Sequence, residues 1–162
     1  MMRRSWLFVA LSSLAASTAS AADDAHFAAK LVLPGGQTAV VAEGDLEPRS
    51  IGSYSVRLYA AGVPDQTDTA SFVAGLFERR DGTIESAELA DIDRDGRDEI
   101  VVVMRSVGTS SYLTVHAITV REKHLELRAT VVGLAKDADP VAALLAVTAK
   151  EADPNRGPSK RP

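Results

Sequence analysis

The stretch Ile100-Val101-Val102-Val103-Met104 decides the fold, because it is apolar at every position. A strand with one face in water alternates apolar and polar residues, whereas a strand covered on both faces is apolar throughout. The stretch therefore predicts a central strand, covered on both sides, in the middle of the core.

The sequence on either side of this strand mostly alternates with period two, as half-buried strands do. The clearest example is Leu125-Glu126-Leu127-Arg128-Ala129-Thr130-Val131. Turn residues separate the alternating segments. Eight strands are expected, at residues 26–33, 37–43, 52–61, 69–78, 83–90, 99–105, 111–121 and 124–132. This spacing predicts an all-β fold, an antiparallel sandwich or barrel.

One short helix is expected near the C-terminus. Asp139 is a favourable N-cap residue, and Pro140 suits the first helical position. The apolar face that follows consists of Val141, Leu144, Leu145 and Val147. We expect this helix to pack against one end or edge of the sheet.

Residues 1–21 have the pattern of a cleaved secretory signal peptide. Arg3 and Arg4 precede an apolar run over residues 6–16, and the small-residue tripeptide Ala19-Ser20-Ala21 follows. The run is shorter than the roughly 20 residues of a membrane-spanning helix. The chain also has no cysteine for lipid attachment. We therefore expect export, cleavage after Ala21 and no membrane attachment afterwards.

Residues 22–150 have the length of one domain with a single core. Residues 151–162 hold three prolines and several charges but no large apolar side chain, so we expect a disordered tail. The formal net charge of −4 becomes −6 when the two arginines of the signal peptide are removed. This acidic balance argues against nucleic acid as a partner.

An acidic loop leads into the central strand. Carboxylates stand at its first, third, fifth and ninth positions, which are Asp91, Asp93, Asp95 and Glu99. Ca²⁺ binds several oxygen ligands from one tight loop, and this spacing supplies them. Val102 replaces the glutamate that an EF-hand needs at position 12, and strands flank the loop. The loop is more similar to the Asp-rich loops of FG-GAP-type β repeats.

A second interpretation of the acidic loop needs no metal. Aspartates accept hydrogen bonds from the backbone of their own turns, and Arg94 and Arg97 can balance the charge. Both interpretations stay open, and in both the loop fixes the entry into the central strand.

A hydroxyl loop, defined here as Ser106–Tyr112, follows the central strand. Arg105-Ser106-Val107-Gly108 at its start repeats the pattern of Arg49-Ser50-Ile51-Gly52, and a Ser-Tyr pair follows in both places. The simplest interpretation is a solvated hairpin, because serine and threonine suit turns. The alternative is a surface shaped to fit a partner.

The chain resembles the periplasmic inhibitors of invertebrate-type (i-type) lysozyme made by Gram-negative bacteria. The similarity lies in residues 40–59, 80–83 and 90–112, and residues 40–59 are its most specific part. The resemblance implies a periplasmic inhibitor with a β-sandwich fold. Together with the sequence pattern it predicts an antiparallel β-sandwich of about eight strands with one short C-terminal helix. It also implies a homodimer that inserts a loop into the substrate cleft of an i-type lysozyme.

The family's inserted loop reads Ser-Gly-Ser-Tyr, which falls on Thr109, Ser110, Ser111 and Tyr112. Thr109 keeps a hydroxyl, but Ser110 loses the easy access to positive φ that glycine has. Hydroxyls can donate to a carboxylate or accept from a carboxylic acid, and a glycosidase cleft holds both. The implied binding residues are Ser106, Gly108, Thr109, Ser110, Ser111 and Tyr112. For the earlier segment, Ser50–Tyr54, a role in the scaffold or at the rim is expected.

Two other functions remain open. An exported calcium-binding β module would have a structural or adhesive role, and an inhibitor of another lysozyme class could use the same hydroxyl chemistry. An enzyme is not expected, because the chain lacks cysteine and the motifs of common nucleophile and nucleotide sites. Its histidines, His26, His116 and His124, lie in or beside predicted strands without metal-ligand spacing.

Overall fold

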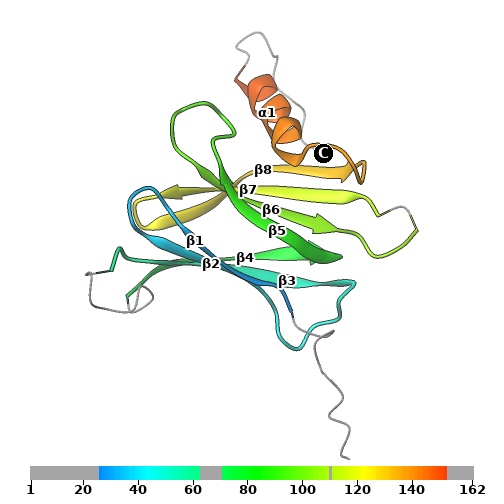
Figure 1. Cartoon of the computed structure of the whole chain (residues 1–162), viewed down its shortest axis with the longest axis horizontal. Coiled ribbons are helices and arrows are strands. Elements are labelled where there is room, and N and C mark those ends of the chain that lie inside the picture. The colour runs from blue at the N-terminus through cyan, green and yellow to red at the C-terminus, as the bar shows by residue number, and fades with distance from the viewer. Residues whose placement is uncertain (1–25, 63–70, 110, 153–162) are drawn as a thin grey trace, which may run out of the picture.

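The computed structural model describes residues 26–62, 71–109 and 111–152, and within them two four-stranded antiparallel sheets face each other (Figure 1). The first sheet has the order β1 (Ala28–Val32), β2 (Thr38–Glu43), β3 (Ile51–Tyr59) and β4 (Phe72–Asp81). The second has the order β5 (Thr83–Ala90), β6 (Glu99–Arg105), β7 (Leu113–Arg121) and β8 (His124–Leu134). The prediction of an eight-stranded antiparallel β-sandwich is confirmed.

Strand β4 differs most from its predicted range. It was expected at 69–78 but continues to Asp81. The longer strand includes Arg80, whose side chain is buried. A charged residue thus occupies one of the inward-facing positions of β4. An arginine at an inward position does not fit the apolar alternation, which is why the sequence pattern ends too early.

Strand β6 is buried on both faces, as its sequence predicts. Ile100, Val102 and Met104 pack between the two sheets. Val101 and Val103 belong to a second apolar cluster on the outer face of the second sheet. Each fully buried aliphatic side chain contributes about 1.5–3 kcal/mol, so this strand anchors both layers of the core.

The helix α1 (Pro140–Glu151) covers the outer face of the second sheet, over β8 and β7. The expected place at an edge is right in part, because β8, which the helix contacts most, is the edge strand of this sheet. The helix also reaches over the face, where Leu144 packs with Val101, Val103 and their apolar neighbours. The N-cap prediction holds: the Asp139 carboxylate accepts from the backbone N–H groups of Val141 at 2.9 Å and Ala142 at 3.1 Å.

The helix ends at the first residue of the expected tail. Glu151 is the last helical residue, and its carboxylate pairs with Arg128 of β8 at 2.7 Å. Residues 1–25 and 153–162, which include the expected signal peptide and most of the expected tail, lie outside the described residues. Within the described ranges, no helix has the length and hydropathy needed to span a membrane.

Candidate functional site

The hydroxyl loop joins β6 to β7 at one end of the sandwich (Figure 1). Both strands that the loop connects are almost wholly buried. Its neck is closed by a hydrogen bond from the backbone N–H of Ser106 to the carbonyl oxygen of Tyr112, at 2.9 Å. Ser110 lies outside the described residues. The base of the loop is therefore fixed by the core itself.

Arg105 ties the returning limb of the loop to the neighbouring strand. Its Nη1 donates to the carbonyl oxygen of Ser111 at 3.1 Å, and its Nη2 pairs with the Glu85 carboxylate of β5 at 2.7 Å. Neither Arg105 nor Glu85 is among the site residues predicted from the sequence. The only available signal was that the repeated phrase begins with arginine in both copies.

Two of the described residues of the loop have positive φ. Gly108 has φ 145°, and Ser111 has φ 46°, a value uncommon for a residue with a side chain. The Ser111 hydroxyl donates to the Gly108 carbonyl at 3.2 Å, which supports this tight conformation. The family loop has its glycine at position 110, which lies outside the described residues; among the described loop residues positive φ occurs at Gly108 and Ser111.

The loop presents a few side chains to solvent. Tyr112 is 51% exposed, and Val107 and Thr109 are also exposed, whereas Ser106 and Ser111 are half-buried. The exposed hydroxyls of Thr109 and Tyr112 can each donate or accept a hydrogen bond, and the tyrosine ring offers a flat apolar surface. Such a set suits a cleft with carboxyl groups and a surface for a sugar ring.

The two copies of the repeated phrase meet at this end of the sandwich. The backbone N–H of Gly82, in the β4–β5 turn, donates to the Ser50 carbonyl at 2.9 Å. Gly82 has φ 96° and touches the base of the hydroxyl loop, since a Cβ built on it would lie 1.9 Å from the Arg105 carbonyl oxygen. Glycine is therefore required at this contact.

The two tyrosines of the repeat have different environments. Tyr112 is exposed, whereas Tyr54 is buried between the sheets, with its hydroxyl 2.7 Å from Nδ1 of His116. Burial raises the pKa of Tyr54 and lowers that of His116, so both groups are neutral at physiological pH. The earlier tyrosine thus belongs to the scaffold.

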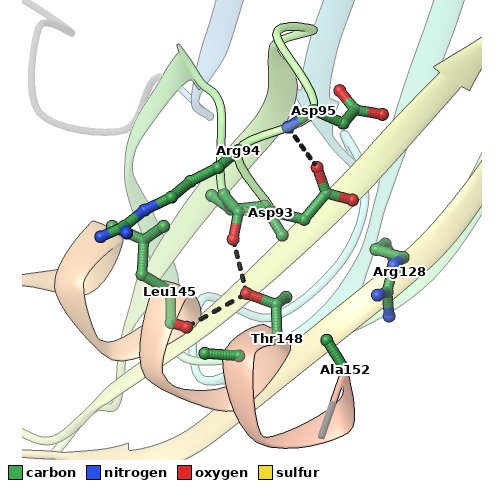
Figure 2. Close-up of a pocket in the computed structure, with 9 residues that line it drawn as sticks. Asp93, Arg94, Asp95, Arg128, Leu145, Thr148 and Ala152 are labelled. Atoms are coloured by element: carbon green, nitrogen blue, oxygen red, sulfur yellow. Dashed lines mark hydrogen bonds between the residues drawn. The ribbon is translucent and has the colours of Figure 1, made fainter. Parts of the chain in front are cut away.

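The acidic loop lies at the other end of β6, beside α1 (Figure 2). The Asp91 carboxylate accepts from the backbone N–H groups of Arg94 at 2.6 Å and Gly96 at 2.9 Å. Asp93 accepts from the N–H of Asp95 at 3.3 Å, and the Asp95 carboxylate pairs with the Arg97 side chain at 2.5 Å. These are the turn hydrogen bonds of the metal-free interpretation.

Three of the four predicted metal ligands also come together. One carboxylate oxygen from each of Asp91, Asp93 and Glu99 lies within 4.8 Å of the others, whereas Asp95 is not in this group. Glu99 is 2% exposed and accepts from the Ile92 N–H at 3.2 Å. Its burial and the nearby aspartates raise its pKa. Three carboxylates from one tight loop fit the ligands that Ca²⁺ prefers.

A hollow of about 340 Å³ separates the acidic loop from the helix (Figure 2). The Thr148 hydroxyl donates across its floor to the Ile92 carbonyl at 2.5 Å and also contacts the Leu145 carbonyl at 3.2 Å. Arg128 and Asp93 line the same hollow. The acidic loop is therefore attached to the helix as well as to β6.

Fold and site together define an antiparallel β-sandwich with exposed hydroxyl side chains, Thr109 and Tyr112, in a loop at one end. A family model described as periplasmic lysozyme inhibitor of I-type lysozyme matches residues 25–148. The chain belongs to this family, and the resemblance read from the sequence is confirmed. No match is found among curated proteins.

Among the solved structures similar to this chain, two contain the periplasmic I-type lysozyme inhibitor of Aeromonas hydrophila. The first is 40% identical, has a TM-score of 0.67, and covers 73% of this chain and 98% of its own. The second, a complex with Meretrix lusoria lysozyme, is 41% identical, has a TM-score of 0.67, and covers 73% of this chain and 94% of its own.

Proposed function

We propose that this protein inhibits an I-type lysozyme by inserting the hydroxyl loop into the substrate cleft of the enzyme. The observation that carries the proposal is the exposure of Thr109 and Tyr112 on a backbone that Arg105 holds in place. Family membership supports it, as does the lysozyme complex of the Aeromonas hydrophila relative.

The chemistry of the loop suits the catalytic carboxyls of a glycosidase. One carboxyl of such a pair is protonated and the other is ionised. A hydroxyl can accept from the first or donate to the second, so Thr109 and Tyr112 can satisfy either group without carrying charge into the cleft. The Tyr112 ring can occupy a position where a sugar ring stacks.

The internal bonds of the loop lower the entropic cost of binding. Ordering a flexible side chain or loop on association costs about 0.5–1.5 kcal/mol per immobilised side chain. Because Arg105, Ser106 and Ser111 already fix the backbone, most of this cost falls on folding rather than on binding.

The proposal includes the cellular setting. Residues 1–21 direct the chain to the periplasm, where it acts by binding and without catalysis.

The protein also forms a homodimer through the outer face of the first sheet, which exposes Phe72 and Phe77. Exposed aromatic residues on a flat face are the kind of surface that a symmetric interface buries. Light scattering of the mature chain and of Phe77→Ser measures this association.

Lysis of suspended cell walls by an I-type lysozyme, with the mature chain titrated in, tests inhibition. Chicken-type lysozyme run in parallel tests selectivity. Tyr112→Ala should raise the inhibition constant at least about 30-fold, because buried interface tyrosines are worth roughly 2 kcal/mol or more. Tyr112→Phe separates the hydroxyl from the ring, and Val32→Ala on β1 is the matched control. A silent Tyr112→Ala would overturn loop insertion.

A second candidate function rests on the three converging carboxylates of the acidic loop. In an exported β module that binds Ca²⁺, Asp91, Asp93 and Glu99 would hold the ion and stabilise the entry into β6. This candidate predicts that Ca²⁺ raises the melting temperature and that Asp93→Asn abolishes the rise. It also predicts that Tyr112→Ala has no effect on any activity of the protein.

A further inference from the structure

The hydroxyl loop is too small to account for a stable complex alone. It spans the seven residues 106–112. A stable protein interface uses about 20–30 residues from each side and buries roughly 800 Å² per partner. If the loop enters the lysozyme cleft, other segments at the same end of the sandwich must contact the enzyme outside the cleft.

The loop between β2 and β3, residues 44–50, is the nearest candidate. Its last residue, Ser50, accepts from the Gly82 N–H at 2.9 Å. Gly82 in turn packs against the backbone of Arg105 and Ser106. The two loops are thus separated by the width of one turn, and both lie at the same end of the sandwich (Figure 1).

A buried guanidinium holds the β2–β3 loop in place. Arg80 is 1% exposed, and its side chain donates to the backbone carbonyls of Pro48 at 3.1 Å, Arg49 at 2.8 Å and Gly82. The Glu47 carboxylate accepts from the backbone N–H and the hydroxyl of Ser53 and lies 3.8 Å from Arg80.

These contacts attach the backbone of the exposed loop to a buried side chain. Gly52 shows how close the packing is, since a Cβ built there would lie 2.8 Å from the Arg80 guanidinium. A loop fixed in this way loses little conformational freedom when it binds a partner, which favours its use as a contact surface.

The same loop presents apolar side chains to solvent. Leu46 is 100% exposed, and Ile51, where β3 begins, is half-exposed. Asp45 beside Leu46 is also exposed, and so is Asp81 opposite Ile51 in the register of β3 and β4. Arg49 of the same loop is exposed too, so the surface fits an apolar hollow with charged residues of both signs around it.

We infer that the β2–β3 loop is a second contact for the lysozyme that receives the hydroxyl loop, and that Leu46 and Ile51 bind the enzyme beside its cleft. This inference rests on the proposed function. It concerns other residues and another kind of contact than the proposed insertion into the cleft. The hydroxyl loop offers hydroxyl groups to the cleft, whereas the β2–β3 loop offers an apolar surface to the rim of the cleft.

The test measures the dissociation constant and dissociation rate of the complex between the mature chain and an I-type lysozyme. Leu46→Ala and Ile51→Ala should each weaken binding about three- to tenfold, mainly by faster dissociation, without a change in melting temperature. Val32→Ala is the matched control: Val32 is 63% exposed and pairs with Thr38, at the opposite end of β2 from this loop. It should bind as the unmodified chain does.

Tyr112→Ala separates the failure of this inference from the failure of the proposed function. If Tyr112→Ala abolishes inhibition while Leu46→Ala and Ile51→Ala bind as the unmodified chain does, the second contact is overturned and loop insertion stands. If Tyr112→Ala is silent while Leu46→Ala and Ile51→Ala weaken binding, the second contact stands and loop insertion falls. Absence of any binding overturns both.

Discussion

The guanidinium of Arg105 lies 3.1 Å from the carbonyl oxygen of Ser111, so the residue before the hydroxyl loop holds the limb that returns from it. Arg105→Ala should weaken lysozyme binding about tenfold, because the loop would become flexible and would have to be ordered on binding. The dissociation rate of the complex, measured beside the melting temperature of the free chain, checks this prediction.

Glu85→Gln provides the control for Arg105. The glutamine keeps a hydrogen-bond acceptor for the guanidinium but removes the charge, and this exposed ion pair contributes at most about 1 kcal/mol. The variant should therefore bind nearly as well as the unmodified chain. If Arg105→Ala leaves the dissociation rate unchanged, Arg105 does not position the loop.

The pair formed by Tyr54 and His116 predicts a loss of stability in mild acid. The Tyr54 hydroxyl lies 2.7 Å from Nδ1 of His116, and burial of this pair disfavours the charged imidazolium. Burial lowers the pKa of His116 below its usual 6.5, so the unfolded chain takes up a proton at a higher pH than the folded chain. The stabilisation is complete above pH 6.5 and is lost as the pH falls through the lowered pKa.

Melting temperatures of the unmodified chain and of His116→Gln, compared from pH 7.5 to 4.5, measure this effect. Carboxylates titrate in the same range, but they are common to both proteins. The unmodified chain should therefore lose more stability than the variant as the pH falls below 6.5. A difference between the two that does not change with pH would contradict the assignment.

Arg80 should be one of the most sensitive positions of the chain. Arg80→Met would leave Glu43 buried without its cation and would leave several backbone carbonyls without a donor. Breaking a buried ion pair costs about 3–5 kcal/mol of unfolding free energy. Arg79→Met is the matched control, because Arg79 is the next residue and is exposed. Its effect, measured by urea denaturation, should be within about 0.5 kcal/mol.

Thr148 should be a specific attachment between the helix and the acidic loop. Thr148→Val keeps the shape of the side chain but removes the hydroxyl that donates to the Ile92 carbonyl. Leaving that buried acceptor without a donor costs about 1–3 kcal/mol. Thr148→Ser, which keeps the hydroxyl, should lose less. Equal unfolding free energies for the valine and serine variants would show that the hydrogen bond contributes nothing.

The strands and the layers could be predicted from the sequence because they follow from apolar periodicity. The unbroken apolar run at Ile100–Met104 identified the central strand, and Asp139 with Pro140 identified the start of the helix. The face that the helix covers could not be predicted. It follows from the apolar outer face that Val101, Val103 and Val115 form together, and this requires knowledge of which strands are neighbours.

The place of the candidate site could be predicted from the sequence, but the contacts that hold it together could not. Family resemblance placed the hydroxyl loop at Ser106–Tyr112, but the roles of Arg105 and Arg80 depend on backbone carbonyls that come close only in the folded chain. The acidic loop shows the same limit. Its spacing suggested four equivalent ligands, whereas the fold turns Asp95 toward Arg97 and away from the other three.

The hydroxyl loop and the acidic loop lie at opposite ends of β6, and this separation has a consequence for engineering. A strand of seven residues is roughly 23 Å long, so changes at one end of it do not touch the other end. The hydroxyl loop can then be exchanged for the loops of other family members, or randomised as in a display library, while the acidic loop and the helix go on supporting the same core. The sandwich would serve as a small cysteine-free scaffold from which inhibitors could be selected against enzymes whose clefts accept a short loop.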